Sequence, residues 1–226
     1  VRPVDNVKEA KAAYDDVIGY SGNEKIIIEE YIRGPELSVN AFVIDGDAIF
    51  FQESDRISFD EYPGGIIKEH RIPSRFTFKD EVLRSKIHKM TQKAVNKLSI
   101  DNGPAYIQLK LDKEKDPKII EFTPRLDGCH IWRLINFYSG ADILDATFRL
   151  LFGHKKKAKE TLERVDKGEE YILKFLVEKP NNIVNKEKYD LSESLFSDWY
   201  YNQGDKVREI NGFIERVGYQ IVRVKR

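Results

Sequence analysis

The chain has 226 residues, of which 41% are hydrophobic, enough for one large or two small packed domains. Lys plus Arg and Asp plus Glu both number 38, so the formal net charge is zero. This balance argues against nucleic acid or an anionic membrane as the main partner. The single cysteine, Cys129, excludes an internal disulfide and is typical of a reducing compartment. The sequence shows neither a signal-peptide pattern nor an apolar run that would span a bilayer, so we expect a cytoplasmic location.

The first predicted element is a helix that begins near Val7 and ends at Gly19. The next segment, Lys25 to Ile32, carries three consecutive isoleucines, which predict a strand buried on both sides. Arg33-Gly34-Pro35 then predicts a turn. The helix assignment depends on apolar residues at helical spacing, namely Val7, Ala10, Tyr14, Val17 and Ile18.

A β-hairpin, a loop, a strand and a long helix are expected next. Leu37–Ile44 and Ala48–Glu53 flank an Asp45-Gly46 turn, which is a strong hairpin signal. Residues 54–66 are polar and predict a surface loop, and Ile67–Ile72 predicts a further strand. Residues 79–98 predict a helix whose apolar side faces the core, formed by Leu83, Ile87, Met90, Ala94 and Leu98.

The most informative segment begins at Gly103 and is predicted to be a second hairpin. Residues 105–111 and 118–123 alternate in polarity, and the polar connection between them ends in proline. If Leu111 pairs with Lys118, then Gln108 lies opposite Glu121. The wet face of this hairpin would then carry Gln108, Glu121 and Thr123, and the core face Ile107, Leu109, Ile120 and Phe122.

The wet face has the chemistry of a metal and phosphate site. Cross-strand Cβ atoms lie about 4.5–5.5 Å apart, so the oxygens of Gln108 and Glu121 can converge on one hard cation such as Mg²⁺. Arg125 follows the second strand and suits phosphate oxygens, which it binds bidentately. On the residues alone, the alternative is a solvated hairpin face in which Glu121 pairs diagonally with Lys110.

Two short helices and a strand-rich tail are expected after this hairpin. Helices are predicted over residues 130–138 and 143–152, the second capped by Asp142 and ended by Gly153. The charged stretch 154–167 is either a linker or an exposed helix, and strands are predicted near 171–177 and 219–224. We also predict that the tail contributes core aromatic residues: Trp199, Tyr200 and Tyr201.

The chain resembles the ATP-grasp superfamily over most of residues 1–153 and, more weakly, in the tail. The match consists of Gln-Leu-Lys-Leu beginning at residue 108, Glu-Phe-Thr-Pro-Arg at 121–125, and a glycine-containing turn leading to a helix with His130 and Arg133. It is most similar to the carbamoyl-phosphate synthetase large chain and the L-amino acid ligases. The resemblance implies an α+β, ATP-grasp fold: an antiparallel sheet with flanking helices, plus a small C-terminal α+β domain.

The resemblance also implies ATP and Mg²⁺ (or Mn²⁺) as cofactors. The backbone carbonyl of Glu30 and the amide of Ile32 would read the adenine edge, with Glu29 nearby. Glu36 would hold the ribose, and Arg2 stands where the family carries a phosphate-binding lysine. Gln108, Glu121 and Thr123 would hold the metal ion, and Arg125, His130 and Arg133 would serve the transferred phosphoryl group and the carboxylate substrate.

The implied activity is ATP-dependent ligation. A carboxylate attacks the γ-phosphate to give an acyl phosphate and ADP, and an amine or thiol then displaces phosphate. The partners would be small-molecule carboxylate and amine substrates, with a homodimer as an open alternative to a monomer. Two other functions stay open: an ATP-binding module without turnover, and an enzyme that activates bicarbonate in the manner of carbamoyl-phosphate synthetase.

The sequence also departs from the family pattern. Thr123 replaces an asparagine, Asp127 replaces a glycine, and no glycine-rich loop precedes the first predicted helix. We therefore expect the chain to be a C-terminal portion, or else a shortened relative. The expected divisions are 1–32, a remnant of the small lobe with the adenine hinge; 33–153, the large lobe with the metal and phosphate site; and 154–226, a small C-terminal domain.

Overall fold

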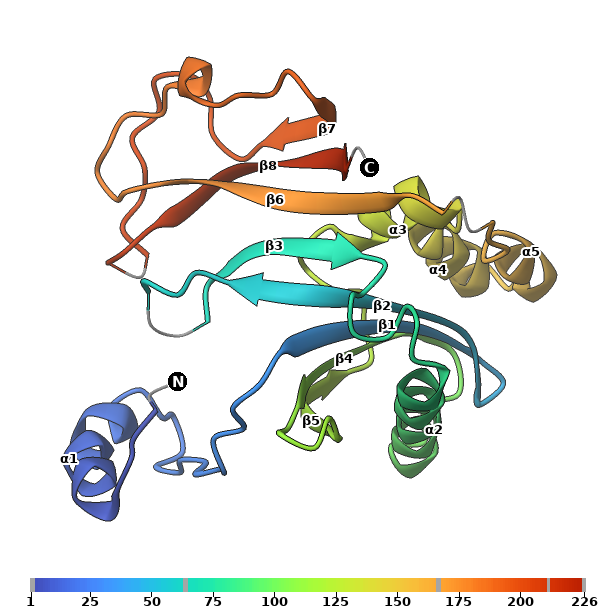
Figure 1. Ribbon diagram of the computed structural model, residues 1–226, viewed down its shortest axis with the longest axis horizontal. Coiled ribbons are helices and arrows are strands. Elements are labelled where there is room, and N and C mark those ends of the chain that lie inside the picture. Colours follow the sequence, from blue (N-terminus) through green and yellow to red (C-terminus); the bar gives the residue numbers. More distant parts are fainter. Residues whose placement is uncertain (1–2, 63–64, 166–167, 211, 225–226) are drawn as a thin grey trace.

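The computed structural model describes residues 3–62, 65–165, 168–210 and 212–224. Its centre is one antiparallel sheet with the strand order β5-β4-β1-β2-β3-β6-β8-β7 (Figure 1). The α+β fold with an antiparallel sheet and flanking helices is therefore confirmed. The strands are β1 Glu36–Ile44, β2 Asp47–Ser58, β3 Ile67–Ile72, β4 Gly103–Leu111, β5 Pro117–Thr123, β6 Glu170–Glu178, β7 Ser194–Trp199 and β8 Glu215–Val224.

The helices cover both faces of this sheet. Along β1, side chains alternate between two buried clusters, because successive residues of a strand point to opposite faces. Val39 and its odd-numbered neighbours pack with α2 and β4, whereas Phe42 and Ile44 pack with α3 and α4. The helices are α1 Val7–Ile18, α2 Glu81–Lys97, α3 Ile131–Ser139, α4 Ile143–Leu151 and α5 Lys155–Glu160, with a 3₁₀ turn at Lys186–Lys188.

Helix α1 has the predicted bounds, but the segment that follows it differs from the prediction. Its cap is Asn6, whose side chain accepts a hydrogen bond from the Glu9 backbone N–H. The expected buried strand at 25–32 is wrong: these residues form no strand, and Ile27 and Ile28 are 85% and 76% exposed. An extended segment becomes a strand only when a neighbour supplies ladder hydrogen bonds, and none of the described residues does so here. In Figure 1, α1 lies apart from the sheet.

Helix α2 follows the predicted stripe over its first turns. Asp80 caps it by accepting from the Leu83 backbone N–H at 2.9 Å, and Leu83 and Ile87 are buried. Thr91 and Val95 are buried in the later turns. Leu98, predicted to be core, is 57% exposed because it is the cap residue beyond the last helical turn.

Strand β2 is longer than predicted. Polar composition suggested a loop from residue 54, but the strand runs to Ser58, and Ser54 and Asp55 are buried. The Asp55 carboxylate is neutralised by Arg75, whose Nε lies 2.6 Å from Oδ2. Composition was misleading because a polar residue such as Asp55 finds its partner inside the fold rather than in water.

The β4–β5 hairpin confirms the predicted Gln108–Glu121 pair, but the Leu111–Lys118 pair from which that prediction was derived is wrong. Gln108 lies opposite Glu121, and Tyr106 lies opposite Thr123. A bulge follows, so Leu111 pairs with Pro117 rather than with Lys118. The same bulge explains why Ile120, expected in the core, is 40% exposed.

The tail continues the main sheet. β6 pairs with β3, and Leu173 and Tyr219 share one buried cluster with Phe42 of β1. The divisions proposed at residues 32 and 153 stay predictions, and the sheet itself runs through the second of them. Of the three aromatic residues expected in the tail core, Tyr201 is buried, whereas Tyr200 is 43% exposed. Within the described residues, no helix is long and apolar enough to cross a membrane.

Candidate functional site

Polar side chains form one part of the sheet face opposite α2. Along β1, Glu36, Ser38 and Asn40 occupy the positions that precede the apolar Phe42 on this face. The strand register places Glu36 between Arg56 of β2 and Lys110 of β4, and it places Ser38 between Ser54 and Gln108. We call this surface of β1, β2, β4 and β5 the polar face; it contains Glu36, Ser38, Asn40, Gln52, Ser54, Arg56, Tyr106, Gln108, Lys110, Glu121 and Thr123.

Glu36 is the central acceptor of the polar face. Its carboxylate Oε1 accepts hydrogen bonds from the Arg56 guanidinium and from the Gln108 amide. The side chains of Arg56 and Glu36 are only 12% and 14% exposed. The structure thus joins the residue predicted to bind ribose to the residue predicted to bind metal. Because Gln108 donates through Nε2, its amide oxygen remains as the acceptor for a cation.

Glu121 and Thr123 complete a set of oxygen donors. Glu121 lies directly across from Gln108 and is exposed. The Thr123 hydroxyl is buried and has no hydrogen-bond partner among the described residues. Amide, carboxylate and hydroxyl oxygens are the donors that Mg²⁺ prefers, so the residues present fit such an ion. Among the residues that the structure describes, no group of three or more His, Cys, Asp or Glu side chains could hold a metal ion.

Arg125 lies at the edge of this set. Its side chain is exposed, and one guanidinium nitrogen donates to the Leu126 carbonyl at 2.8 Å. The guanidinium carbon is 5.9 Å from the centre of the Tyr106 ring. Since Tyr106 belongs to the polar face, Arg125 is placed where it can reach an anion bound there.

The segment predicted to be the adenine hinge is attached to the polar face through Lys110. The Lys110 ammonium donates to the Ile32 carbonyl at 3.4 Å and lies 5.0 Å from the Tyr31 ring centre. At Gly34 an added Cβ would lie 1.8 Å from the Leu111 carbonyl oxygen, so the close approach of this turn to β4 requires glycine. Glu29 and Glu30 are exposed. Arg2 lies outside the described residues.

His130 and Arg133 pack against the tail. The His130 ring stacks on Tyr219 at 4.3 Å, and the Arg133 guanidinium lies 3.9 Å from the Phe196 ring centre and 4.7 Å from that of Trp132. Burial, followed by the nearby Arg133 charge, lowers the pKa of His130. These contacts give both residues a packing role, and their contact with a carboxylate substrate stays a prediction.

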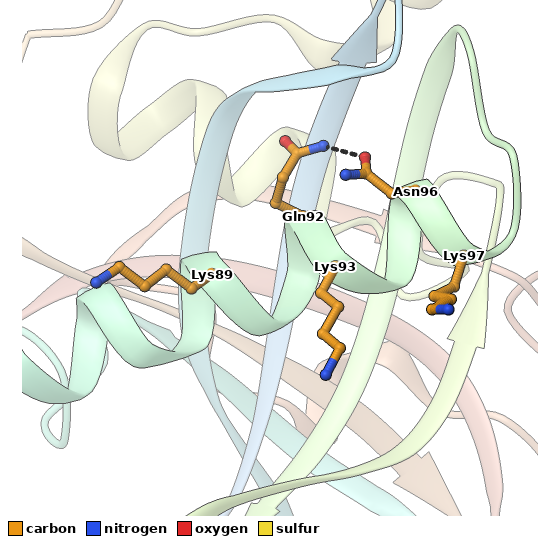
Figure 2. A pocket seen from close by; sticks show the side chains of 5 residues that line it. All are labelled: Lys89, Gln92, Lys93, Asn96 and Lys97. Atoms are coloured by element: carbon orange, nitrogen blue, oxygen red, sulfur yellow. Dashed lines mark hydrogen bonds between the residues drawn. The ribbon is translucent and has the colours of Figure 1, made fainter.

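A hollow of about 520 Å³ lies elsewhere, on the outer side of α2 (Figure 2). Gln92 in its wall donates to Asn96 at 2.7 Å and to the Gly46 carbonyl at 2.8 Å, and it accepts from the Ala48 N–H. Its polar groups therefore tie α2 to the β1–β2 turn. Because α2 covers the sheet face opposite Glu36, we assign no nucleotide to this hollow, which is lined by Lys89, Gln92, Lys93, Asn96 and Lys97.

Comparison with known protein families gives one match that covers more than half of the chain. A family model described as the ATP-grasp domain matches residues 3–132. This chain belongs to the ATP-grasp family. It is 31% identical over 163 residues to a phosphoribosylamine–glycine ligase of Methanococcus maripaludis, a match that covers 66% of this chain and 34% of the relative. The chain thus spans about a third of the length of the curated relatives it matches.

Solved structures support the same ATP-grasp fold. The L-amino acid ligase of Bacillus licheniformis superposes with a TM-score of 0.71 at 19% identity, covering 97% of this chain and 56% of that one. Phosphoribosylglycinamide synthetase of Anaerococcus prevotii gives 0.69 at 16% identity, covering 96% and 55%. A biotin carboxylase complex of Campylobacter jejuni gives 0.71 at 16% identity, covering 99% and 50%. At these identities the superpositions establish the fold alone.

No role was predicted from the sequence for Arg56, which is largely buried, or for His70, which is fully buried. They lie opposite each other on β2 and β3. His70 is fully buried, and neither ring nitrogen has a hydrogen-bond partner among the described residues. Burial, with smaller contributions from Arg56 and Arg216, lowers the pKa of His70 to about 3. His70 is two residues from Ile72 in β3, so the period of two places both on one sheet face and indicates that His70 is buried. The sequence alone does not show what covers that face.

We expect His70 to make the fold sensitive to acid. The unfolded imidazole binds a proton near pH 6.5, whereas the folded one does so only near pH 3. The unfolded state therefore binds more protons in this range, and stability falls as pH decreases from about 6.5 toward 3, by at most about 1.4 kcal/mol per pH unit from this group. Urea unfolding of wild type and His70→Gln at pH 7 and pH 5 measures the difference.

The variant should lose less stability than wild type between the two pH values. His154→Gln is the matched control, because His154 is exposed and should leave the wild-type pH dependence unchanged. If wild type and His70→Gln lose the same free energy of unfolding between pH 7 and pH 5, His70 does not control the acid response.

Proposed function

We propose that this chain supplies the Mg²⁺ and ATP site of an ADP-forming ligase that joins a carboxylate to an amine or thiol through an acyl phosphate. The main support is the contact between Glu36 and Gln108 on neighbouring strands, with Glu121 directly across from Gln108. Membership of the ATP-grasp family and the ligase names of the relatives agree with this assignment. We also propose that the protein is cytoplasmic and that it forms a homodimer.

The side chains have separate roles in the proposed site. Gln108, Glu121 and Thr123 would hold the metal ion, which when bound neutralises charge on the phosphate oxygens. Arg56 keeps the Glu36 carboxylate in place, and through it the orientation of the Gln108 amide. This pre-organisation matters because phosphoryl transfer depends mainly on positioning and on charge stabilisation.

Arg125 is proposed to stabilise the transferred phosphoryl group. Its guanidinium is exposed beside Tyr106 and has donors to spare beyond its bond to the Leu126 carbonyl. A flexible cation at the edge of the polar face can follow the phosphoryl group as it moves to the carboxylate. The backbone of Glu30 and Ile32, with Glu29 nearby, is proposed to bind adenine, and Glu36 is proposed to bind ribose.

ADP release tests this function. Purified protein is incubated with Mg²⁺, ATP and pairwise combinations of carboxylates and amines, and ADP and phosphate are measured together. Release that requires both an organic carboxylate and an amine is the expected result. Release with bicarbonate alone would indicate a bicarbonate-activating enzyme, and thermal stabilisation by Mg²⁺ and ATP with no release under any condition would indicate a binding module.

A further inference from the structure

The extended segment of residues 26–31 reaches the sheet without pairing to it. Among the described residues, none forms a hydrogen bond with this segment. The chain is tied to β4 only beyond it: the Pro35 carbonyl accepts from the Leu111 backbone N–H at 3.0 Å, and Gly34 lies against the Leu111 carbonyl. The position of the predicted adenine hinge therefore depends on contacts near its end, at Ile32.

Lys110 of β4 makes the first hydrogen bond between the hinge and the sheet. Its ammonium donates to the Ile32 carbonyl at 3.4 Å and lies 5.0 Å from the centre of the Tyr31 ring. Glu36 lies opposite Lys110 in the strand register, but its carboxylate is paired with Arg56. The ammonium is thus engaged by a backbone carbonyl and an aromatic ring of the hinge rather than by the acid across from it.

The contact of the hinge with α1 is weaker. The Tyr31 ring lies 5.6 Å from the Arg33 guanidinium, which pairs with Asp5 at 3.2 Å. The side chains of this pair are 78% and 80% exposed, and an exposed ion pair contributes little to stability. Lys110 is half-buried on a strand of the sheet, so it is the firmer of the two attachments.

We propose that Lys110 is a positioning residue for the base: it fixes the backbone of Ile32 against β4 and thereby sets the selectivity between 6-amino and 6-oxo purines. The inference rests on the proposed function, in which the Glu30 carbonyl and the Ile32 amide bind the base edge. Lys110 and Gln108 share one face of β4 and lie about 6.5 Å apart along the strand. One strand therefore carries both the residue that fixes the hinge and the residue proposed to hold the metal ion.

The selectivity follows from the pattern of donors and acceptors. Adenine presents an amino donor and a ring-nitrogen acceptor, which match a backbone carbonyl and a backbone N–H. Hypoxanthine presents an oxygen acceptor and a ring N–H donor, so both contacts are mismatched. Mismatched polar groups are most unfavourable when the protein groups cannot move away from them. A fixed Ile32 therefore rejects the 6-oxo base, whereas a loosened hinge can shift and relieve the mismatch.

Calorimetric titration with three ligands in the presence of Mg²⁺ tests the proposal: ATP, inosine triphosphate and inorganic tripolyphosphate. We expect wild type to bind ATP at least about 100-fold more tightly than inosine triphosphate. Lys110→Met keeps most of the stem but loses the ammonium, so this ratio should fall about tenfold, since a hydrogen bond from a charged donor is lost. Tripolyphosphate has no base, and its affinity should change no more than in a control that loses the same charge.

Lys118→Met is that control. Lys118 lies directly opposite Lys110 on β5, but its ammonium pairs with Asp112 at 3.3 Å. The control variant should keep the wild-type ratio of ATP to inosine triphosphate affinity, and Lys110→Arg, which retains a charged donor, should keep most of it. If Lys110→Met is poorly folded, Lys110→Gln should show the same loss, because its shorter side chain ends before the Ile32 carbonyl.

Three outcomes would overturn the assignment of Lys110 and leave the proposed function standing. They are equal binding of ATP and inosine triphosphate by wild type, an unchanged ratio in Lys110→Met and Lys110→Gln, and an equal loss of affinity for ATP and tripolyphosphate in these variants. If wild type binds neither ATP nor tripolyphosphate with Mg²⁺, the proposed function fails, and the assignment of Lys110 fails with it.

Discussion

We expect Glu121→Ala to abolish Mg²⁺-dependent nucleotide binding and to leave the fold intact. The carboxylate lies across from Gln108 on the edge strand and is exposed, so its loss should change stability by no more than about 0.5 kcal/mol. Removal of even an outer partner of a metal typically lowers affinity or activity 10–100-fold. A direct ligand should therefore cost at least about 100-fold. Titration with ATP in the presence of Mg²⁺ and in the presence of EDTA measures the part of the nucleotide affinity that depends on the metal.

The control for this prediction is Glu114→Ala. Glu114 is an exposed acid in the loop of the same hairpin, and its removal changes the net charge equally without touching the polar face. Glu121→Gln separates charge from shape, since an amide can still ligate a cation but does not neutralise it. If Glu121→Ala bound nucleotide with the metal dependence of wild type, the metal assignment would be wrong.

We expect Arg56→Met to destabilise the protein by about 3–5 kcal/mol, because breaking a buried ion pair leaves one charge without its partner. The partner is Glu36, and both side chains are largely buried. Methionine fills most of the space of the arginine stem, so the loss should reflect charge rather than packing. Urea unfolding near neutral pH measures the free energy of unfolding.

The double variant Arg56→Met/Glu36→Gln should recover much of this loss, since neither side chain is then charged. The matched control is Arg33→Met: Arg33 pairs with Asp5 at 3.2 Å, but the two side chains are 78% and 80% exposed. That pair should contribute no more than about 1 kcal/mol. A loss for Arg56→Met as small as that for Arg33→Met would mean that the Glu36 pair is solvated in solution.

Local pattern was sufficient to predict most helices and strands. The bounds of α1 follow from its apolar spacing, and the Asp142 cap of α4 was predicted from the sequence. Failures occurred where a distant partner decides the state of a segment. The isoleucines near Ile27 have strand propensity but no strand partner in the described residues. Polar Asp55, expected in a loop, is buried where β2 pairs with Arg71 of β3.

The sequence by itself determined that residues 105–111 and 118–123 form a hairpin, because alternating polarity and a short connecting loop are local features. The register at the loop end was one residue out, and the bulge at Ile120 restores the predicted pair of Gln108 with Glu121. Only the tertiary structure placed Glu36 in contact with Gln108, since β1 lies between β2 and β4 and brings together residues 72 positions apart. Contacts of this kind depend on which strands pair and what covers them, and these are properties of the whole chain.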